Sequence, residues 1–137
     1  MDPHDRELLE QIYGLNWAAL GSQRQAFAGL AELVSEDLEM KLSPEIGARV
    51  IKGLDELREF AEALEQDFQD CRYEAEQIEE CGDRRAVVTG RIDARGRSSN
   101  LPLSGEFGHV WTLEEGEATR MESFRDKAEA RKAGGLE

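Results

Sequence analysis

"GEFGHVWTLEEGEATRMESFRDKAEARKAGGL", residues 105–136, is the stretch that decides the predicted fold. Two extended runs flank the turn signal at Gly116, and apolar and polar residues alternate within each run, as they do in a β-hairpin. The polar residues that follow Phe124 favour a helix. The stretch therefore predicts two long strands folded back on each other and a short polar helix after them.

The register of this hairpin decides which residue lies opposite His109. A three-residue loop that ends in Gly116, with the glycine in the left-handed conformation, places Met121 there. A two-residue turn places Glu122 there instead. Glycine in the third position favours the longer loop, so we expect Met121 to be the neighbour of His109.

One face of the hairpin has the composition of a ligand pocket. Pocket walls are mostly hydrophobic and carry a few hydrogen-bonding groups. The face with this mixture comprises Phe107, His109, Trp111, Leu113, Thr119, Met121 and Ser123. We expect this face to border a cavity. In the alternative interpretation, Val110 and Phe124 face the core and His109 faces a dimer partner.

The rest of the chain supplies helices first and strands afterwards. Apolar residues recur at three-and-four spacing over residues 5–20, 25–34 and 54–70, which predicts three helices. Alternation at 35–43 predicts a short strand, and the proline and glycines of 44–53 predict a loop able to cover the mouth of a cavity.

Further extended segments, bounded by glycine-bearing turns, cover residues 71–83, 84–96 and 100–114. Helices followed by a run of antiparallel strands predict an α+β fold with the helices on one face of a curved sheet. At 137 residues the chain is expected to form one domain, 1–137.

Charge and cysteine content restrict the partners. Seventeen Lys and Arg against thirty Asp and Glu give a net charge of −13, which argues against nucleic acid and anionic membranes as partners. Cys71 and Cys81 bracket an extended segment that separates them by roughly 33 Å, too far for a disulfide. Free thiols and the lack of an apolar N-terminal signal segment predict a cytoplasmic protein.

Several segments, taken in order, resemble a known family. These are "YGLNWAAL" at 13–20, "VSEDLEM" at 34–40, "IKGLDELREF" at 51–60, "EECGDRRAVVTGRI" at 79–92 and the C-terminal stretch 107–136. Together they resemble the SnoaL-like, or ketosteroid-isomerase-like, branch of the nuclear-transport-factor-2 (NTF2-like) superfamily. The resemblance implies a cone in which three helices from the N-terminal half pack on a strongly curved antiparallel sheet around a deep pocket. It also implies a homodimer formed through the outer face of the sheet.

The resemblance also implies positions for catalytic groups. Ketosteroid isomerases use a carboxylate base and an oxyanion hole made of a tyrosine and a protonated aspartate. By position the base falls at or near Leu42, the tyrosine around Asn16 or Trp17, and the aspartate at His109. A leucine cannot accept a proton and none of the three groups is retained, so the sequence does not predict the steroid-isomerase reaction.

His109 is the candidate catalytic residue. Its unperturbed pKa of about 6.5 suits a general acid or base, and its ring can also donate a hydrogen bond to a ligand carbonyl. The alternative is a buried histidine satisfied by a neighbouring side chain.

The candidate ligand-binding residues are Asn16, Trp17, Met40, Leu42, Phe60, Leu64, Trp111, Met121 and Ser123, for which core packing is the alternative. We predict no metal site and no cofactor, because the histidines and cysteines lack ligand spacing.

These observations predict the binding of a small, mostly apolar organic molecule in a deep pocket. His109 would assist a proton transfer of the isomerase, cyclase or dehydratase kind. The alternative is a non-catalytic ligand-binding or dimeric assembly module whose pocket is closed by its own side chains. Val110, Phe124 and alternate positions of the preceding strands are expected to form an outward apolar patch for the dimer.

Overall fold

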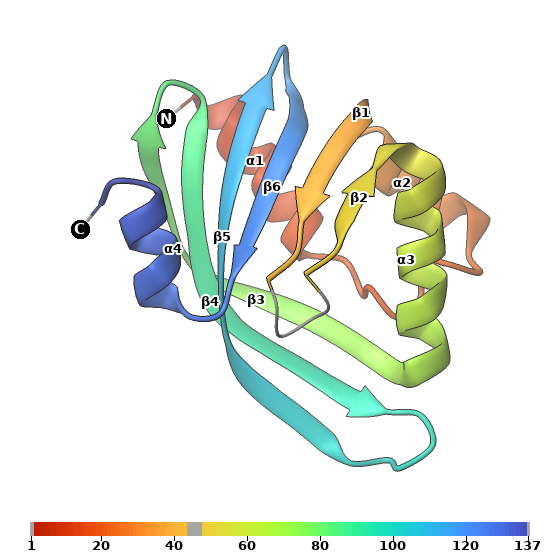
Figure 1. Cartoon of the computed structure of the whole chain (residues 1–137). Helices are drawn as coiled ribbons and strands as arrows, with labels where there is room; N and C mark the ends of the chain where they lie inside the picture. Colours follow the sequence, from red (N-terminus) through yellow and green to blue (C-terminus); the bar gives the residue numbers. More distant parts are fainter. Residues whose placement is uncertain (1, 44–47, 137) are drawn as a thin grey trace.

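Four helices and six strands make up the fold in the computed structural model, which describes residues 2–43 and 48–136 (Figure 1). In chain order they are α1 Pro3–Tyr13, α2 Arg24–Ala31, β1 Val34–Lys41, β2 Val50–Lys52, α3 Gly53–Asp67, β3 Phe68–Gly82, β4 Arg85–Gly96, β5 Pro102–Glu114, β6 Glu117–Phe124 and α4 Lys127–Ala133.

The six strands form one mixed sheet in the order β2-β1-β6-β5-β4-β3. Neighbours are antiparallel except β1 and β6, which are parallel. The prediction of an antiparallel sheet is therefore wrong at this one pair. The parallel pair arises because β1 comes from the N-terminal half and lies beside the last strand of the meander, with the helix α3 and four strands between them in the chain.

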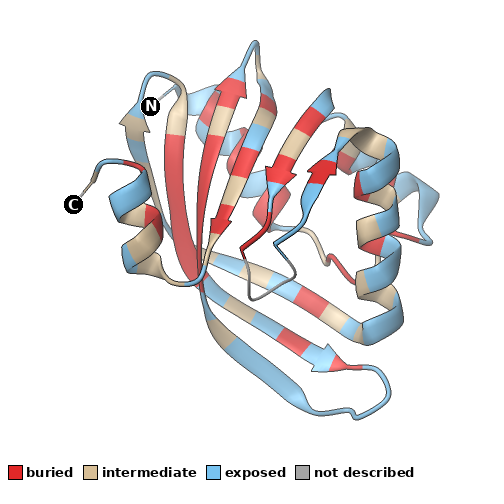
Figure 2. Cartoon of the chain, in the orientation of Figure 1, coloured by how far each residue is buried: buried red, intermediate tan, exposed pale blue. Residues whose placement is uncertain are grey.

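The helices cover the two faces of the sheet unequally. Side chains of α1, α2 and α3 share one large core with the inner face of the sheet, including Leu9, Leu30 and Leu57. Helix α4 packs on the opposite face, where Ala130 joins Val87 and Val110 in a second, small core. Figure 1 shows α4 in front of the sheet and α1 behind it. Figure 2 shows that the far end of β5 is exposed, that exposed and buried residues alternate at the far end of β4, and that the centres of both strands are buried.

The first helix is shorter than its apolar pattern predicts. It ends at Tyr13, and the Gly14 N–H bonds to the Gln11 carbonyl 3.2 Å away. The chain then turns, because the Asn16 side-chain oxygen accepts hydrogen bonds from the backbone N–H groups of Ala18 and Cys71. Residues beyond Gly14 such as Trp17 are still buried, but from a loop tied to β3 rather than from a helix.

The other predicted boundaries shift where an adjoining strand begins. Helix α2 was predicted to reach Val34, which instead begins β1, and α3 was predicted to reach Asp70, although β3 begins at Phe68. The predicted loop at 44–53 contributes the strand β2, which pairs with β1. Its residues 44–47, which were expected to help cover the cavity mouth, lie outside the described residues.

The C-terminal hairpin has the two-residue turn that was the alternative prediction, but both predicted neighbours of His109 are wrong. Glu115 and Gly116 form a two-residue turn with φ of 52° and 81°, and Glu114 pairs with Glu117. Such a turn with positive φ at both positions matches the twist of the two strands. A bulge then shifts the pairing by one residue, so that His109 lies opposite Ser123 rather than Met121 or Glu122.

The bulged residue is Thr119. It was predicted to face the cavity, but its hydroxyl donates to the Thr112 carbonyl, 3.2 Å away. Ala118 takes the inward place and is buried opposite Leu113. Beyond the bulge Met121 faces inward. The inner face of the hairpin therefore matches the prediction except that Ala118 takes the place of Thr119.

The outer face of the sheet does not carry the predicted apolar patch. Val110 is buried under α4, and Phe124 packs against the same small core. Next to them, ion pairs link Lys41 to Glu122 and Arg120 to Glu39 across strands, at 3.7 and 3.6 Å. The expected homodimer stays a prediction, but the surface that motivated it is covered or charged.

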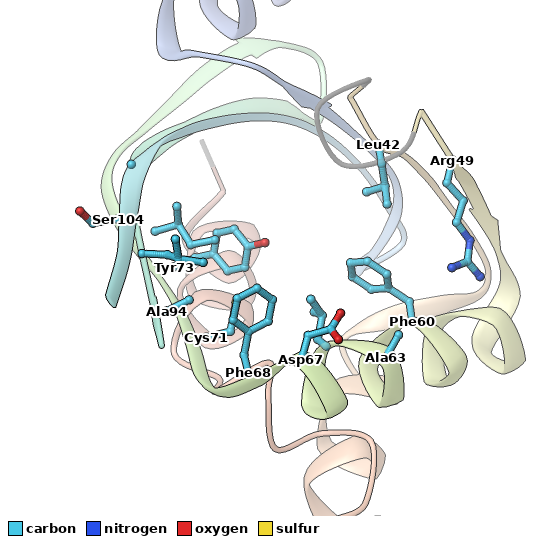
Figure 3. Close-up of a pocket in the computed structure, with 14 residues that line it drawn as sticks. Leu42, Arg49, Phe60, Ala63, Asp67, Phe68, Cys71, Tyr73, Ala94 and Ser104 are labelled. Carbon is cyan, nitrogen blue, oxygen red and sulfur yellow. The ribbon is translucent and has the colours of Figure 1, made fainter. Parts of the chain in front are cut away.

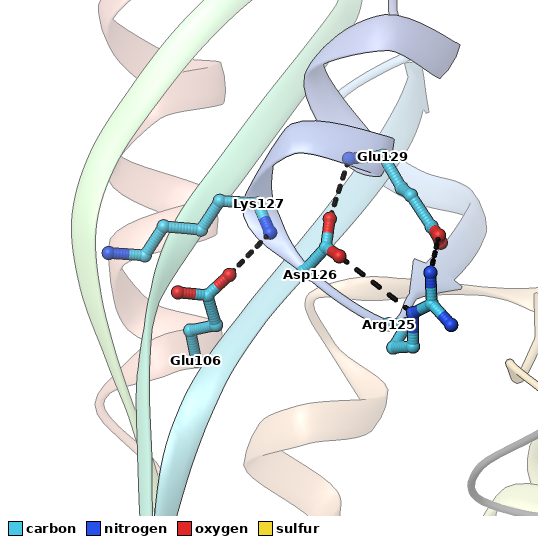
Figure 4. A network of polar contacts seen from close by, with 5 residues as sticks. All are labelled: Glu106, Arg125, Asp126, Lys127 and Glu129. Carbon is cyan, nitrogen blue, oxygen red and sulfur yellow. Dashed lines mark hydrogen bonds and ion pairs between the residues drawn. The ribbon is translucent and has the colours of Figure 1, made fainter.

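Helix α4 is capped at its N-terminus by a polar network (Figure 4). The Asp126 carboxylate accepts a hydrogen bond from the Glu129 N–H at 2.9 Å, and Glu106 accepts one from the Lys127 N–H at 3.1 Å. Arg125 pairs with Glu129 at 2.7 Å. These contacts fix the angle at which the helix leaves β6 and returns over β5.

Removal of this cap is expected to destabilise the protein. The substitution Asp126→Ala leaves a helix N–H group without its partner and should lower the free energy of unfolding by about 1 kcal/mol. Asp126→Asn is the matched control, because asparagine caps equally well, and it should lose less than half as much. Urea unfolding of both variants measures the difference, and equal losses would contradict the capping role.

Within the described residues, none of the helices is long and apolar enough to cross a membrane.

Candidate ligand-binding site

A cavity of about 360 Å³ opens between α3 and the bent halves of β3, β4 and β5 (Figure 3). We call it the outer cavity. Its walls are largely apolar, and its polar side chains include Tyr73 inside and Arg49 and Asp67 at the open side. The described lining residues are Leu42, Arg49, Phe60, Ala63, Leu64, Asp67, Phe68, Cys71, Tyr73, Ile92, Ala94, Leu103, Ser104 and Gly105.

A second space of about 30 Å³, the inner chamber, lies deeper in the fold and shares Leu42, Phe60 and Tyr73 with the outer cavity. Its volume is above the roughly 10–15 Å³ that a cavity needs to hold one water molecule. The described lining residues are Ile12, Tyr13, Trp17, Met40, Leu42, Phe60, Tyr73, His109, Trp111, Met121 and Ser123. The inner chamber therefore has room for a small group only.

His109 is held by a buried chain of hydrogen bonds. Its Nδ1 lies 2.6 Å from the Tyr13 hydroxyl oxygen, which accepts a hydrogen bond from the Trp111 Nε1–H at 2.7 Å. An indole N–H can only donate, so the Tyr13 oxygen is the acceptor in that bond. The Tyr13 hydrogen is then free to donate to His109 Nδ1. We infer that the imidazole proton sits on Nε2, since Nδ1 is occupied as an acceptor.

Burial keeps His109 uncharged. Desolvation lowers its pKa from 6.5 to about 3, because a charged imidazolium would lose its water shell without gaining a carboxylate partner. No carboxylate is among the described residues that line the inner chamber. A histidine with so low a pKa is a poor general base. Its Nε2–H remains a good neutral hydrogen-bond donor.

The Nε2–H group of His109 faces the inner chamber. Among the described residues, the one fully enclosed side-chain nitrogen or oxygen without a hydrogen-bond partner is Arg84 Nε. His109 Nε2 also has no hydrogen-bond partner among the described residues, but it is not one of the fully enclosed atoms. We therefore infer that it is accessible from the inner chamber, which His109 lines. The alternative, a histidine satisfied by its neighbours, thus applies to Nδ1, while Nε2 has no hydrogen-bond partner among the described residues.

Tyr73 stands between the two spaces and lines both. Its ring packs edge-on against Tyr13, Trp17 and Phe107, which fixes its direction. Figure 3 shows its hydroxyl pointing into the outer cavity. Burial raises the pKa of this hydroxyl well above 10, so it stays protonated and can donate.

The predicted site residues come together, with one exception. Trp17, Met40, Leu42, Phe60, Trp111, Met121 and Ser123 border the inner chamber with His109, and Leu64 borders the outer cavity. Asn16 borders neither space in the described structure. Its side chain instead links the loop after α1 to the Cys71 N–H of β3.

Sequence reasoning missed both tyrosines. The family resemblance suggested a tyrosine position at Asn16 or Trp17, whereas the tyrosine beside His109 is Tyr13, the last residue of α1. The four-residue spacing from Leu9 to Tyr13 places both on the buried face and was the available signal. Tyr73 could have been found from the alternation in β3 that also turns Cys71 inward.

Residues 16–121 match the family described as the SnoaL-like domain. No curated protein matches the chain by sequence. Three solved structures illustrate the likeness of fold. An NTF2-like protein of unknown function from Burkholderia pseudomallei is 20% identical, with 94% of this chain and 95% of that one covered and a TM-score of 0.72. TerC, co-crystallised with polyporic acid, is 20% identical over 96% of this chain and 98% of that one, with a TM-score of 0.73. A phenazine biosynthesis-related protein from Pseudomonas aeruginosa is 20% identical over 98% and 82%, with a TM-score of 0.71.

Proposed function

Since this chain belongs to the SnoaL-like domain family, we propose that it binds a small, mostly apolar organic molecule in the outer cavity. The volume of about 360 Å³ supports this, because ligand sites typically begin at roughly 300 Å³. The apolar walls supply the hydrophobic contact that such a ligand needs. The co-crystallisation of TerC with polyporic acid and the phenazine biosynthesis-related neighbour also favour a small organic ligand.

A carbonyl oxygen of this ligand would enter the inner chamber and accept a hydrogen bond from His109 Nε2–H. The observation that carries this proposal is the 2.6 Å contact between Tyr13 and His109 Nδ1, from which we infer that the proton is on Nε2. The volume of the chamber suits one oxygen atom rather than a larger group. The Ser123 hydroxyl lines the same chamber and is a second possible donor.

Polarisation of a carbonyl is the chemistry that this arrangement would supply. A fixed neutral donor in a site without water stabilises negative charge that develops on the oxygen, and it makes the neighbouring C–H groups more acidic. Isomerase, cyclase and dehydratase reactions all use such a step. The proton acceptor would come from the outer cavity, where Asp67 is the carboxylate among the described lining residues.

A non-catalytic binding or assembly module is the second candidate. It is favoured by Leu42, which occupies the expected position of the base and lines both spaces, and by the small volume of the inner chamber. A homodimer through the outer face of the sheet is compatible with either function. Light scattering at micromolar concentration would detect it as a doubled mass.

The proposal is tested with two ligands that differ in one atom group. 2-Acetylnaphthalene carries a carbonyl, and 2-isopropenylnaphthalene carries a C=CH₂ group of the same shape. We expect the ketone to bind about tenfold more tightly, which is the value of one buried hydrogen bond. Quenching of intrinsic fluorescence reports binding directly, because the two tryptophans, Trp17 and Trp111, both line the inner chamber.

His109→Leu should remove the preference for the ketone and leave the binding of the hydrocarbon unchanged. The hydrocarbon therefore serves as a control for correct folding of the variant. An unchanged preference in His109→Leu would remove His109 from the site. Lack of binding by both compounds to the wild-type protein would favour the closed, non-catalytic module.

A further inference from the structure

We propose that the ligand is an acid, with a carboxylate at its outer end that Arg49 binds. This inference rests on the proposed function, since it concerns the opposite end of the same ligand. With a carbonyl oxygen in the inner chamber, the ligand body would lie along the wall formed by Leu42, Phe60 and Leu64. Its other end would then reach the open side of the outer cavity.

Arg49 is the one cation among the described residues that line the outer cavity. It precedes β2, and its carbonyl accepts a hydrogen bond from the Leu42 N–H at 2.8 Å, so its backbone is fixed. Arg49 is exposed, and Figure 3 shows its side chain on the same side of the cavity as Phe60. The side chain is therefore attached to a positioned backbone at the solvent boundary of the cavity.

The guanidinium of Arg49 makes no ion pair or side-chain hydrogen bond with any residue in the ranges 2–43 and 48–136. Other arginines of this acidic chain do, as in the pairs Arg84–Asp5 and Arg120–Glu39. A planar guanidinium is suited to bidentate binding of a carboxylate. Arg49 thus offers an unused carboxylate-binding group at the entrance of an apolar cavity.

The carboxylate of Asp67 shares this open side and would repel an anion, but a second cation lies beside it. The Arg97 guanidinium bonds to the carbonyls of Glu65 and Phe68, at 2.8 and 3.2 Å, which flank Asp67 on α3 and β3. The Arg97 N–H also bonds to the Asp67 carbonyl at 2.9 Å. Arg97 does not line the cavity, but its charge beside the backbone of Asp67 offsets part of the repulsion that an anionic ligand would meet there.

Three probes with one shared acetyl end test the inference. They are 6-acetyl-2-naphthoate, its neutral analogue 2,6-diacetylnaphthalene and its cationic analogue 6-acetyl-2-(aminomethyl)naphthalene. We expect the naphthoate to bind about three- to tenfold more tightly than the diacetyl compound, and the cation most weakly. Quenching of the two tryptophans measures all three affinities.

Arg49→Gln should bring the affinity for the naphthoate down to that for the diacetyl compound and leave the latter unchanged. The matched control is Arg91→Gln, which removes an exposed positive charge next to Ile92 on β4, on the strand face opposite the cavity lining. It should leave the preference intact. An equal loss in both variants would indicate a general charge effect and overturn the role of Arg49.

The remaining outcomes separate this inference from the proposed function. Binding of the diacetyl compound without any preference for the naphthoate overturns the acid specificity alone, as does tighter binding of the cation. If none of the three probes binds the wild-type protein, the proposed function is wrong and the inference falls with it.

Discussion

Lowering the pH from 7 to 4.5 is expected to destabilise the protein by about 2–3 kcal/mol through His109 alone. Burial lowers the pKa of His109 to about 3 in the folded state, against 6.5 in the absence of burial. Between these two values only the unfolded chain binds the proton. The contribution is therefore fully present above pH 6.5 and is lost as the pH falls, at roughly 1.4 kcal/mol per pH unit.

Urea unfolding at both pH values checks this expectation, with His109→Gln as the reference. Glutamine does not titrate, and its amide can still bond to Tyr13. Other effects of pH on the free energy of unfolding are common to both proteins, so they cancel in the comparison. The wild-type protein should lose about 2–3 kcal/mol more than the variant. Equal losses would mean that His109 is not buried in its neutral form.

Tyr13→Phe is expected to cost about 2–4 kcal/mol of unfolding free energy. The tyrosine hydroxyl has two partners, the Trp111 N–H at 2.7 Å and His109 Nδ1 at 2.6 Å. Phenylalanine fills nearly the same space but leaves both partners buried and unpaired. Each unsatisfied group costs about 1–3 kcal/mol, because it lost its water on folding.

Tyr73→Phe is the matched control for this substitution. Tyr73 packs against the same rings, yet its hydroxyl has no hydrogen-bond partner among the described residues. Its removal should change the free energy of unfolding by less than about 0.5 kcal/mol. Thermal or urea unfolding of the two variants gives the comparison. Similar losses in both would show that the Tyr13 hydrogen bonds contribute little.

Periodicity alone predicted most of the elements but few of their ends. The apolar spacing that continues from Ile12 to Leu20 reads as one helix, although the chain leaves the helix at Gly14. What ends it is a long-range contact, the bond from the Cys71 N–H to the Asn16 side chain. Local spacing contains no information about a partner 55 residues away.

The position of α4 could not be predicted from its own pattern either. It packs closely on β5 because Gly108 has no side chain, and a Cβ added there would lie 2.4 Å from the Ala130 Cβ. Small residues on both elements therefore allow the contact that buries Val110. Val110 was predicted to lie in an exposed patch, because the pattern of its own strand gives no sign of the helix that covers it.

Alternation did recover the inner face of the hairpin, and with it Trp111, Met121 and Ser123 around His109. The bulge at Thr119 escaped prediction, because one extra residue in a strand leaves no mark on either turn or composition. The low pKa of His109 also could not be predicted from the sequence, but for a different reason. Its pKa depends on burial by residues from several elements, Tyr13 among them, that only the folded chain brings together.

Nitrogen-15 NMR of the imidazole ring would show whether His109 presents a neutral Nε2–H to the inner chamber. With uniformly labelled protein at pH 5.5, we expect a neutral ring with the proton on Nε2 and an unprotonated Nδ1 that accepts from Tyr13. His4, the other histidine of the chain, provides a reference in the same spectrum. An imidazolium signal for His109 at this pH, or a proton on Nδ1, would contradict the account.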